Sequence, residues 1–183
     1  MYQAIWEAAL MRHAISVLLQ NEVGALTRMT GMFSSRGYNI DSLNVAPTDD
    51  PTVSRVTLVT TVSDSAIAQL NAQLAKLIDV VSIHDMTLGD HFERELIIVK
   101  IKLATGGLAK AMLLAKKFSA HILDDSQASC TIQLTGRVAE IDEFIVEAKA
   151  IGGLSAVARS GSVAVSKGEV TLSSYDANHH LSA

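Results

Sequence analysis

The stretch that decides the fold of the first half of this chain reads Asn-Glu-Val-Gly-Ala-Leu, from Asn21 to Leu26. It stands between an apolar, strand-like run at residues 15–19 and a helical pattern, so it predicts a turn from a strand into a helix. A glycine at such a turn, here Gly24, lets a ligand approach the backbone, and the free N–H groups of a first helical turn attract an anion such as a carboxylate. The stretch therefore predicts an amino-acid-binding site with no bond-breaking chemistry.

The residues around this stretch predict one strand, one helix and a hairpin. A strand is expected at residues 12–20, and Gly37 is expected to end the following helix as its C′ residue. Strands at residues 38–46 and 55–62 flank a turn rich in proline and aspartate and form the hairpin. The first helix has apolar positions at i, i+3, i+4 and i+7, namely Leu26, Met29, Thr30 and Phe33.

A second helix and a closing strand complete a βαββαβ unit. Ser63 and Asp64 supply N-cap chemistry for the helix, and a strand is expected at residues 80–86. The helix carries one apolar side, formed by Ile67, Leu70, Leu74 and Leu77.

The same order of elements is expected again after a polar connector at residues 87–93. Its members are a strand at residues 95–103, a helix that begins at Gly106-Gly107-Leu108, two short strands around residues 124–128, a helix with Val138, Ile141, Ile145 and Ala148, and a strand at residues 154–159. The prediction is an α+β fold of two tandem ferredoxin-like units. The expected domains are residues 11–86 and 94–161, followed by a mostly flexible tail at residues 162–183, with residues 176–183 frayed.

The strands also indicate an oligomer. The first strand has apolar residues at both parities, with Ile15, Val17 and Leu19 alternating against Ala14 and Leu18. Two helices can cover only one face of each sheet, so the other face is expected to pack on another subunit or domain.

Composition excludes several classes of function. The 183 residues are 49% hydrophobic and carry a formal net charge of −4 without a basic run, so nucleic acid is not an expected partner. The apolar runs are shorter than the ~20 residues that span a membrane, and residues 1–10 lack the basic start and apolar centre of an export signal. The single cysteine, Cys130, is expected to be a half-buried strand thiol. A cytoplasmic protein is expected.

No catalytic or metal-ligating group is identifiable. The six histidines have no metal-binding spacing, and the doublets Asp49-Asp50 and Asp124-Asp125 are expected at turns or strand edges as solvated carboxylates. Ser160 and Ser162 have no identifiable base to activate a nucleophile. Gly106-Gly107 begins its helix as Gly24 does, but a flexible loop is favoured over a second anion site because no asparagine precedes it.

Five stretches carry a resemblance to a known family: Ser16-Val-Leu-Leu-Gln-Asn-Glu-Val-Gly-Ala-Leu26, Arg36-Gly-Tyr-Asn-Ile-Asp-Ser-Leu-Asn-Val-Ala-Pro-Thr48, Ser54-Arg55 with Thr57, Glu93-Arg-Glu-Leu96 and Ala158-Arg-Ser-Gly161. Together they make the chain resemble the small regulatory subunit of acetolactate synthase, also called acetohydroxyacid synthase, with an N-terminal ACT domain. The match spans residues 11–168.

The resemblance implies a regulator of branched-chain amino acid biosynthesis without catalytic residues. Such a chain activates a large catalytic subunit, a thiamine-diphosphate-dependent transferase, and confers feedback inhibition by valine. Thiamine diphosphate, Mg and FAD are expected on that partner and no cofactor on this chain.

The resemblance also implies a pocket between two copies of the ACT domain. One wall is expected from Asn21, Gly24, Ala25 and Leu26, and the other from Asn39 and Ile40 of the neighbouring subunit in a homodimer. Val23 stands where many ACT domains have proline.

Other functions stay open on the residues alone. A stand-alone amino-acid-responsive regulator, not attached to an enzyme, is the main alternative. An RNA-binding module can share the βαββαβ order, but the aromatic stacking residues that it needs are absent from residues 15–19 and 56–60. A small independent enzyme lacks a catalytic constellation. The preferred effector among valine, leucine and isoleucine depends on pocket shape.

Overall fold

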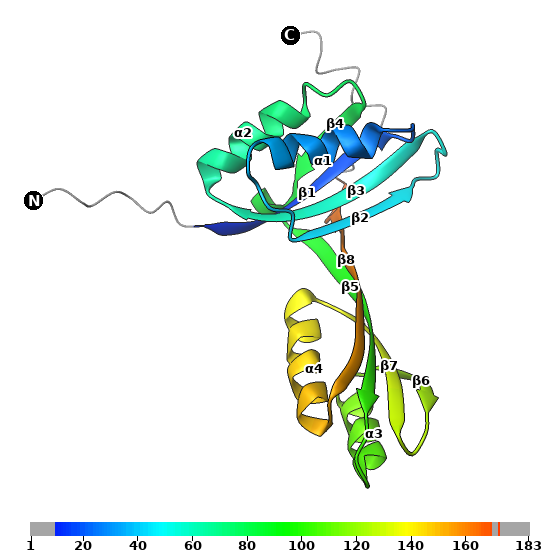
Figure 1. The fold of residues 1–183 in the computed structure, drawn as a ribbon. Helices are drawn as coiled ribbons and strands as arrows, with labels where there is room; N and C mark the ends of the chain where they lie inside the picture. The colour runs from blue at the N-terminus through cyan, green and yellow to red at the C-terminus, as the bar shows by residue number, and fades with distance from the viewer. Residues whose placement is uncertain (1–9, 170–171, 173–183) are drawn as a thin grey trace, which may run out of the picture. The chain divides into compact units, whose positions relative to one another are not determined.

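The computed structural model describes residues 10–169 and residue 172. These residues form two compact units, one made of residues 10–92 with those from Ala164 onward, and one made of Glu93–Val163. In each unit, two helices cover one face of a four-stranded sheet (Figure 1).

The first unit has the predicted βαββαβ order. Its sheet is arranged β2-β3-β1-β4, and all its pairs are antiparallel. The elements are β1 (Met11–Gln20), α1 (Ala25–Ser35), β2 (Ser42–Pro47), β3 (Val53–Val62), α2 (Asp64–Leu74) and β4 (Val80–Asp85), followed by a short 3-10 helix, η1 (Met86–Leu88).

The second unit repeats this arrangement with the sheet order β6-β7-β5-β8. Its elements are β5 (His91–Lys102), α3 (Gly107–Lys117), β6 (His121–Asp125), β7 (Ser129–Gly136), α4 (Val138–Ile151) and β8 (Leu154–Ser166). The predicted α+β fold of two ferredoxin-like units is therefore confirmed.

The cores follow the apolar periodicity that the helices show in sequence. In α1, Met29 and Phe33 are fully buried as predicted, whereas Leu26 is 36% exposed and lies outside the core. In the second unit, the prediction missed Phe144, which is fully buried and packs edge-to-face on Phe118 with ring centroids 5.4 Å apart. A continuous helical spacing therefore locates the core face, but single positions at its margin are set by tertiary packing.

The strand predicted at residues 38–46 begins later, at Ser42. Side-chain hydrogen bonds hold the segment before it in an irregular conformation. The amide Nδ2 of Asn39 donates to Oδ1 of Asp41 at 2.8 Å, and Thr61 Oγ1 donates to Oδ2 of the same carboxylate at 2.7 Å. Short polar side chains compete with the ladder in this way at strand ends.

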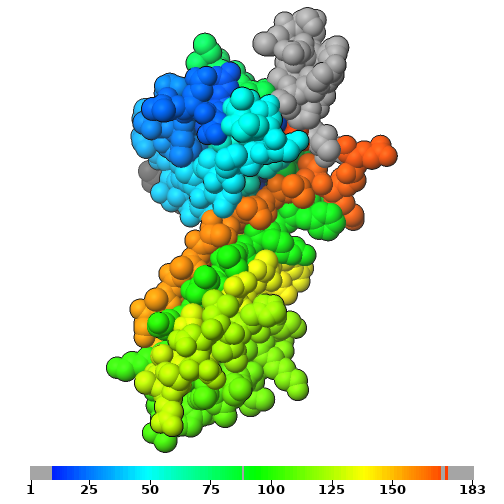
Figure 2. Space-filling model, turned by 90° about the vertical axis from the view of Figure 1, so that its right-hand side faces the viewer, coloured from blue at the N-terminus to red at the C-terminus, as the bar shows by residue number. Residues whose placement is uncertain are grey.

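Two expectations around the second unit are wrong. The connector expected at residues 87–93 is shorter, because β5 already begins at His91. The segment of the same chain that follows β8 lies beside this start, and its Lys167 N–H donates to the Asp90 carbonyl. The flexible tail expected at residues 162–183 begins too early, because β8 continues to Ser166. Much of β8 is exposed, and its orange side chains lie at the surface in Figure 2. The frayed end expected at residues 176–183 lies outside the described residues.

Part of the second face of the first sheet is covered by the chain itself. Ala164 is buried together with Ala14, Val59 and Met86. The Arg55 guanidinium, on the same sheet, donates to Ser16 Oγ at 3.0 Å and to the Leu172 carbonyl at 3.2 Å. The chain itself therefore covers part of the face that was expected to pack on another subunit or domain.

Cys130 is fully buried on β7, not half-buried, and desolvation raises the pKa of its thiol. No helix among the described residues is long and apolar enough to cross a membrane.

Two glycines of the α1 region give a matched stability test. Gly37 follows the helix with φ +73° and completes a Schellman motif. Its N–H donates to the Ser34 carbonyl, and the N–H of Tyr38 donates to the Phe33 carbonyl. Gly37→Ala is expected to lower the free energy of unfolding by about 1 kcal/mol, because an L residue is strained at this φ. Gly31→Ala, inside the helix where a Cβ meets nothing within 4 Å, is expected to raise it by about 0.5 kcal/mol. Urea denaturation measures both, and equal effects of one sign would contradict the capping assignment.

Candidate functional site

The turn between β1 and α1 exposes helical N–H donors. Gly24 is the N-cap residue, with φ +88° in the left-handed region, and no side chain caps the helix. The N–H of Ala25 donates to Glu22 and that of Arg28 to Gly24. Within the described part of the chain, the N–H groups of Leu26 and Thr27 between them have no acceptor. They point out of the N-terminal end of the helix, where the helix dipole favours an anion.

Asn21 ties this turn to the hairpin between β2 and β3. Its side-chain Nδ2 donates to the Pro51 carbonyl at 2.9 Å, and its backbone N–H donates to the Thr52 carbonyl at 2.7 Å. Asn21 therefore bonds the hairpin and not its own turn. Its side-chain oxygen stays available as an acceptor for an ammonium group.

An ion pair that the sequence analysis did not find borders the same turn. Arg28 Nε donates to Asp79 Oδ2 at 2.6 Å, and Nη2 donates to Oδ1 at 2.7 Å. The Asp79 side chain is 5% exposed and that of Arg28 is 49% exposed. The hydrogen bonds raise the pKa of Arg28 and lower the pKa of Asp79 below its usual value. The two residues lie 51 positions apart, so no local pattern in the sequence connects them.

The remaining predicted site residues differ in how much of their side chains is exposed and free to contact a ligand. Ala25 is buried in the core, and Ile40 is partly buried against the same core, so neither exposes its whole side chain. Asn39 is exposed, but its amide is engaged with Asp41 and its carbonyl accepts a hydrogen bond from Thr60 Oγ1 at 2.6 Å.

One chain does not bring the two predicted walls together. Residues 21–24 precede α1 and residues 25–26 begin it, whereas residues 39–40 follow it, and a helix of 11 residues is about 16 Å long. Two cavities elsewhere have volumes of about 330 Å³, between α3 and α4, and about 170 Å³, beside Tyr38 and Gln73, and neither of these two is lined by any of the six predicted residues. In a single chain the two predicted walls therefore lie at opposite ends of α1.

The second unit begins its first helix in the same way. Gly106 is the N-cap of α3 with φ +77°, without a side-chain cap and with open space at its Cβ position. Four residues further on, Lys110 takes the place that Arg28 has after Gly24. No ion pair to Lys110 is present among the described residues, so the second turn lacks the fixed guanidinium of the first.

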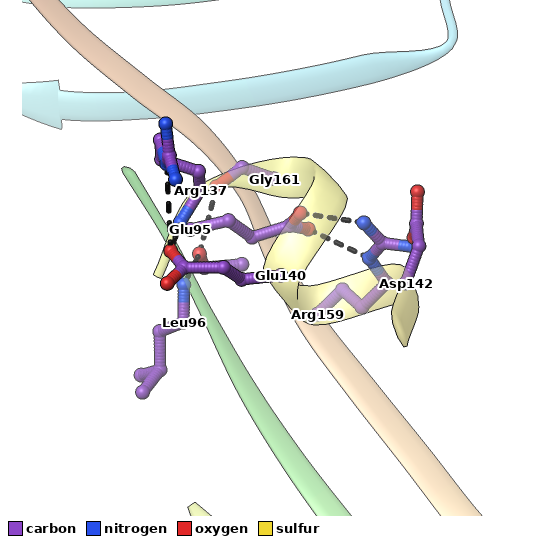
Figure 3. A network of polar contacts seen from close by, with 8 residues as sticks. Glu95, Leu96, Arg137, Glu140, Asp142, Arg159 and Gly161 are labelled. Atoms are coloured by element: carbon purple, nitrogen blue, oxygen red, sulfur yellow. Dashed lines mark hydrogen bonds and ion pairs between the residues drawn. The ribbon is translucent and has the colours of Figure 1, made fainter. Parts of the chain in front are cut away.

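Two of the stretches that carry the resemblance meet on neighbouring strands (Figure 3). Arg159 on β8 donates to both oxygens of Glu95 on β5, at 2.8 and 2.6 Å, and to Asp142 on α4 at 2.9 Å. These bonds raise the pKa of Arg159. Ser160 Oγ accepts from the Leu96 N–H and donates to the Gly161 carbonyl. The network fastens β5, β8 and α4 together, so its role is structural.

The possible metal ligands among residues 10–169 do not gather into one site. No group of three or more histidine, cysteine, aspartate or glutamate side chains there could hold a metal ion. Asp50 accepts from the N–H and Oγ1 of Thr52, which lowers its pKa and caps the hairpin turn. His179 and His180 lie outside the described residues.

Known proteins match this chain along most of its length. Residues 15–82 match the model of the AHAS small subunit-like ACT domain, and residues 94–168 match the model of the small subunit of acetolactate synthase. The acetolactate synthase isozyme 3 small subunit of Escherichia coli K12 is 42% identical over 159 residues, which cover 87% of this chain and 98% of that protein. The acetolactate synthase small subunit of Haemophilus influenzae matches with the same identity and coverage.

A solved structure supports the same relationship. The crystal structure of the acetolactate synthase small subunit from Thermotoga maritima superposes with a TM-score of 0.79 at 26% identity, covering 87% of this chain and 99% of that chain.

The Glu95–Arg159 pair predicts a stability effect in the second unit. Arg159→Gln leaves the Glu95 carboxylate, whose side chain is 5% exposed, without two donors. The expected loss is about 1–3 kcal/mol, since a buried acceptor is left unsatisfied. The control is Arg137→Gln, because that side chain is 72% exposed and its pair with Glu140 is a surface contact with an expected effect below about 0.5 kcal/mol. Thermal unfolding compares the two, and equal shifts of Tm would refute a buried pair.

The Arg28–Asp79 pair predicts a pH dependence of folding. The folded-state pKa of Asp79 is lowered, so its pairing stabilises the fold above the ordinary carboxyl pKa and the stabilisation is lost as pH falls through the folded pKa. Asp79→Asn is expected to be less stable than the unaltered chain at pH 7, and the difference should shrink below about pH 4. Urea denaturation from pH 7 to pH 3 measures it, with Asp49→Asn in the exposed turn as control. A difference that stays constant over this range would sink the prediction.

Proposed function

We propose that this chain, which belongs to the family of acetolactate synthase small subunits, binds a branched-chain amino acid at the β1–α1 turn and transmits its presence to a catalytic large subunit. The observation that carries the proposal is the helix start at Gly24. There, two N–H groups have no acceptor among the described residues, and no side chain caps the helix.

A zwitterionic amino acid suits this turn. Its carboxylate would accept from the N–H groups of Leu26 and Thr27, and the helix dipole adds about 0.3–1 kcal/mol at an exposed site. Val23 is fully exposed and Leu26 is 36% exposed, so apolar surface for an aliphatic side chain lies beside the donors. Valine is the proposed effector, with leucine and isoleucine as the close alternatives.

A second copy of the chain would complete the pocket. Asn39 and Ile40 are separated from Gly24 by the length of α1, so they are proposed to contribute from the partner of a homodimer. β2 is an edge strand of the first sheet, and one side of it is a template for pairing with another chain. The homodimer therefore supplies both walls twice, once on each side of its twofold axis.

The regulated partner would carry the chemistry. The proposed large subunit is a thiamine-diphosphate-dependent transferase that holds thiamine diphosphate, Mg and FAD, and the small subunit raises its activity in the cytoplasm. Feedback inhibition follows if valine binds the inhibited arrangement more tightly. Linkage then requires the large subunit to change the affinity for valine by the same factor.

Gly24→Asp tests the proposal in the reconstituted complex. A Cβ at Gly24 would lie 2.8 Å from Arg28 Nη1, and the new carboxylate would occupy the anion position and repel the effector. Inhibition by valine is expected to be lost while activation of the large subunit is retained. Enzyme assays across valine, leucine and isoleucine measure both properties and identify the preferred effector.

The matched control is Gly106→Asp, at the same position of the second unit, where the φ is +77° and a Cβ meets nothing within 4 Å. This variant is expected to keep its inhibition by valine. If Gly24→Asp keeps full sensitivity at unchanged affinity, the proposed site is wrong. If the unaltered complex responds to none of the three amino acids, the proposed function itself is wrong.

A further inference from the structure

We infer that Arg28 recognises the carboxylate of the amino-acid effector, and that Asp79 holds its guanidinium in place for this contact. The inference rests on the proposed function and adds to it a residue that distinguishes an amino acid from an analogue without a carboxylate.

One nitrogen of the Arg28 guanidinium, Nη1, remains as a donor beside the turn. Asp79 occupies Nε and Nη2, and Nη1 makes no hydrogen bond to any of the described residues. Nη1 lies 2.8 Å from the position that a Cβ would take on Gly24. The free edge of the guanidinium therefore borders the same turn as the uncapped N–H groups of the helix.

Asp79 makes this donor rigid. Its carboxylate is buried, and its backbone carbonyl accepts from the Gln20 N–H at 2.8 Å, which fixes it to the end of β1. A planar guanidinium held by two parallel bonds has little freedom left, so a third contact costs little further conformational entropy. Because the charges of Arg28 and Asp79 offset each other, the selectivity comes from oriented N–H donors and the helix dipole more than from net charge.

This arrangement gives a reason for the glycine at position 24 beyond its φ. Any Cβ there would push the guanidinium away from the turn. A carboxylate introduced at the same position would lie next to Nη1 and compete with the effector for it. The backbone conformation and the placement of Arg28 thus both require glycine at position 24.

The test compares valine with valinamide, which has the same side chain and ammonium group but no carboxylate. Binding to the full chain together with the large subunit is measured by calorimetry and by enzyme inhibition. Arg28→Gln is expected to weaken valine binding by about tenfold or more, as for loss of a hydrogen bond to a charged group. Its effect on valinamide is expected to be within about twofold.

The control is Arg36→Gln on the residue that caps the other end of α1. Arg36 is also exposed and donates to Gln73 and the Met32 carbonyl, so its loss removes a comparable surface charge away from the turn. This variant is expected to bind valine like the unaltered chain.

Arg28→Lys separates recognition from folding, because Arg28→Gln leaves Asp79 buried without its partner. A lysine can pair with Asp79 but has no second nitrogen for the effector. It is expected to restore most of the Tm while valine binding stays weak.

The inference is overturned if Arg28→Lys and a folded Arg28→Gln bind valine within twofold of the unaltered chain, in which case the proposed function stands without it. The same holds if the unaltered complex does not prefer valine to valinamide. If the unaltered complex binds neither compound, the proposed function fails and this inference fails with it.

Discussion

The left-handed turn at Gly24 is the constraint from which the candidate site follows. Gly24, with φ +88° and no side chain, ends the turn between β1 and α1 without capping the helix. In most helices a serine, threonine, asparagine or aspartate at the N-cap accepts from the first-turn N–H groups. Here the sequence forgoes that stabilisation, of about 1 kcal/mol, and leaves donors for another acceptor. The same omission at Gly106 shows that the turn is a feature of the repeated fold, and that the turn alone does not define a site.

What separates the two turns is the side chain one helical turn later. In the first unit, Arg28 is fixed by the buried carboxylate of Asp79, just before β4, whereas Lys110 in the second unit has no such partner among the described residues. A lysine would also place a single mobile point charge where arginine places a planar fork. The fixed donor therefore distinguishes the N-terminal turn as the one suited to bind an anion of defined geometry.

Sequence patterns predicted the elements well because the apolar periodicity in α1 and α2 is strong, with Met29, Phe33, Leu70 and Leu74 all buried. They failed where side chains or distant segments determine the backbone conformation. Asp41 makes β2 begin later, and the segment after β8 makes β5 begin earlier, at His91.

For the candidate site, the local sequence pointed to Gly24 because its signal lies within a single turn. It missed Arg28 with Asp79, since a pair 51 positions apart leaves no periodic trace. The six predicted site residues stay a prediction, because a single chain does not bring the two proposed walls together.

A site divided between two chains has an energetic consequence for regulation. If each copy supplies one wall, an effector bound at the seam binds the dimer and not the separated chains, so it stabilises the dimer by mass action. Any arrangement of the large subunit that shifts one copy relative to the other then alters the affinity for the effector, and the reverse holds by linkage. Rigid donors strengthen this coupling. When the partner copy shifts, the fixed guanidinium and the two fixed N–H groups cannot move with the opposite wall of the pocket. The Arg28–Asp79 pair would thus turn a small displacement at the dimer seam into a loss of several hydrogen bonds at once.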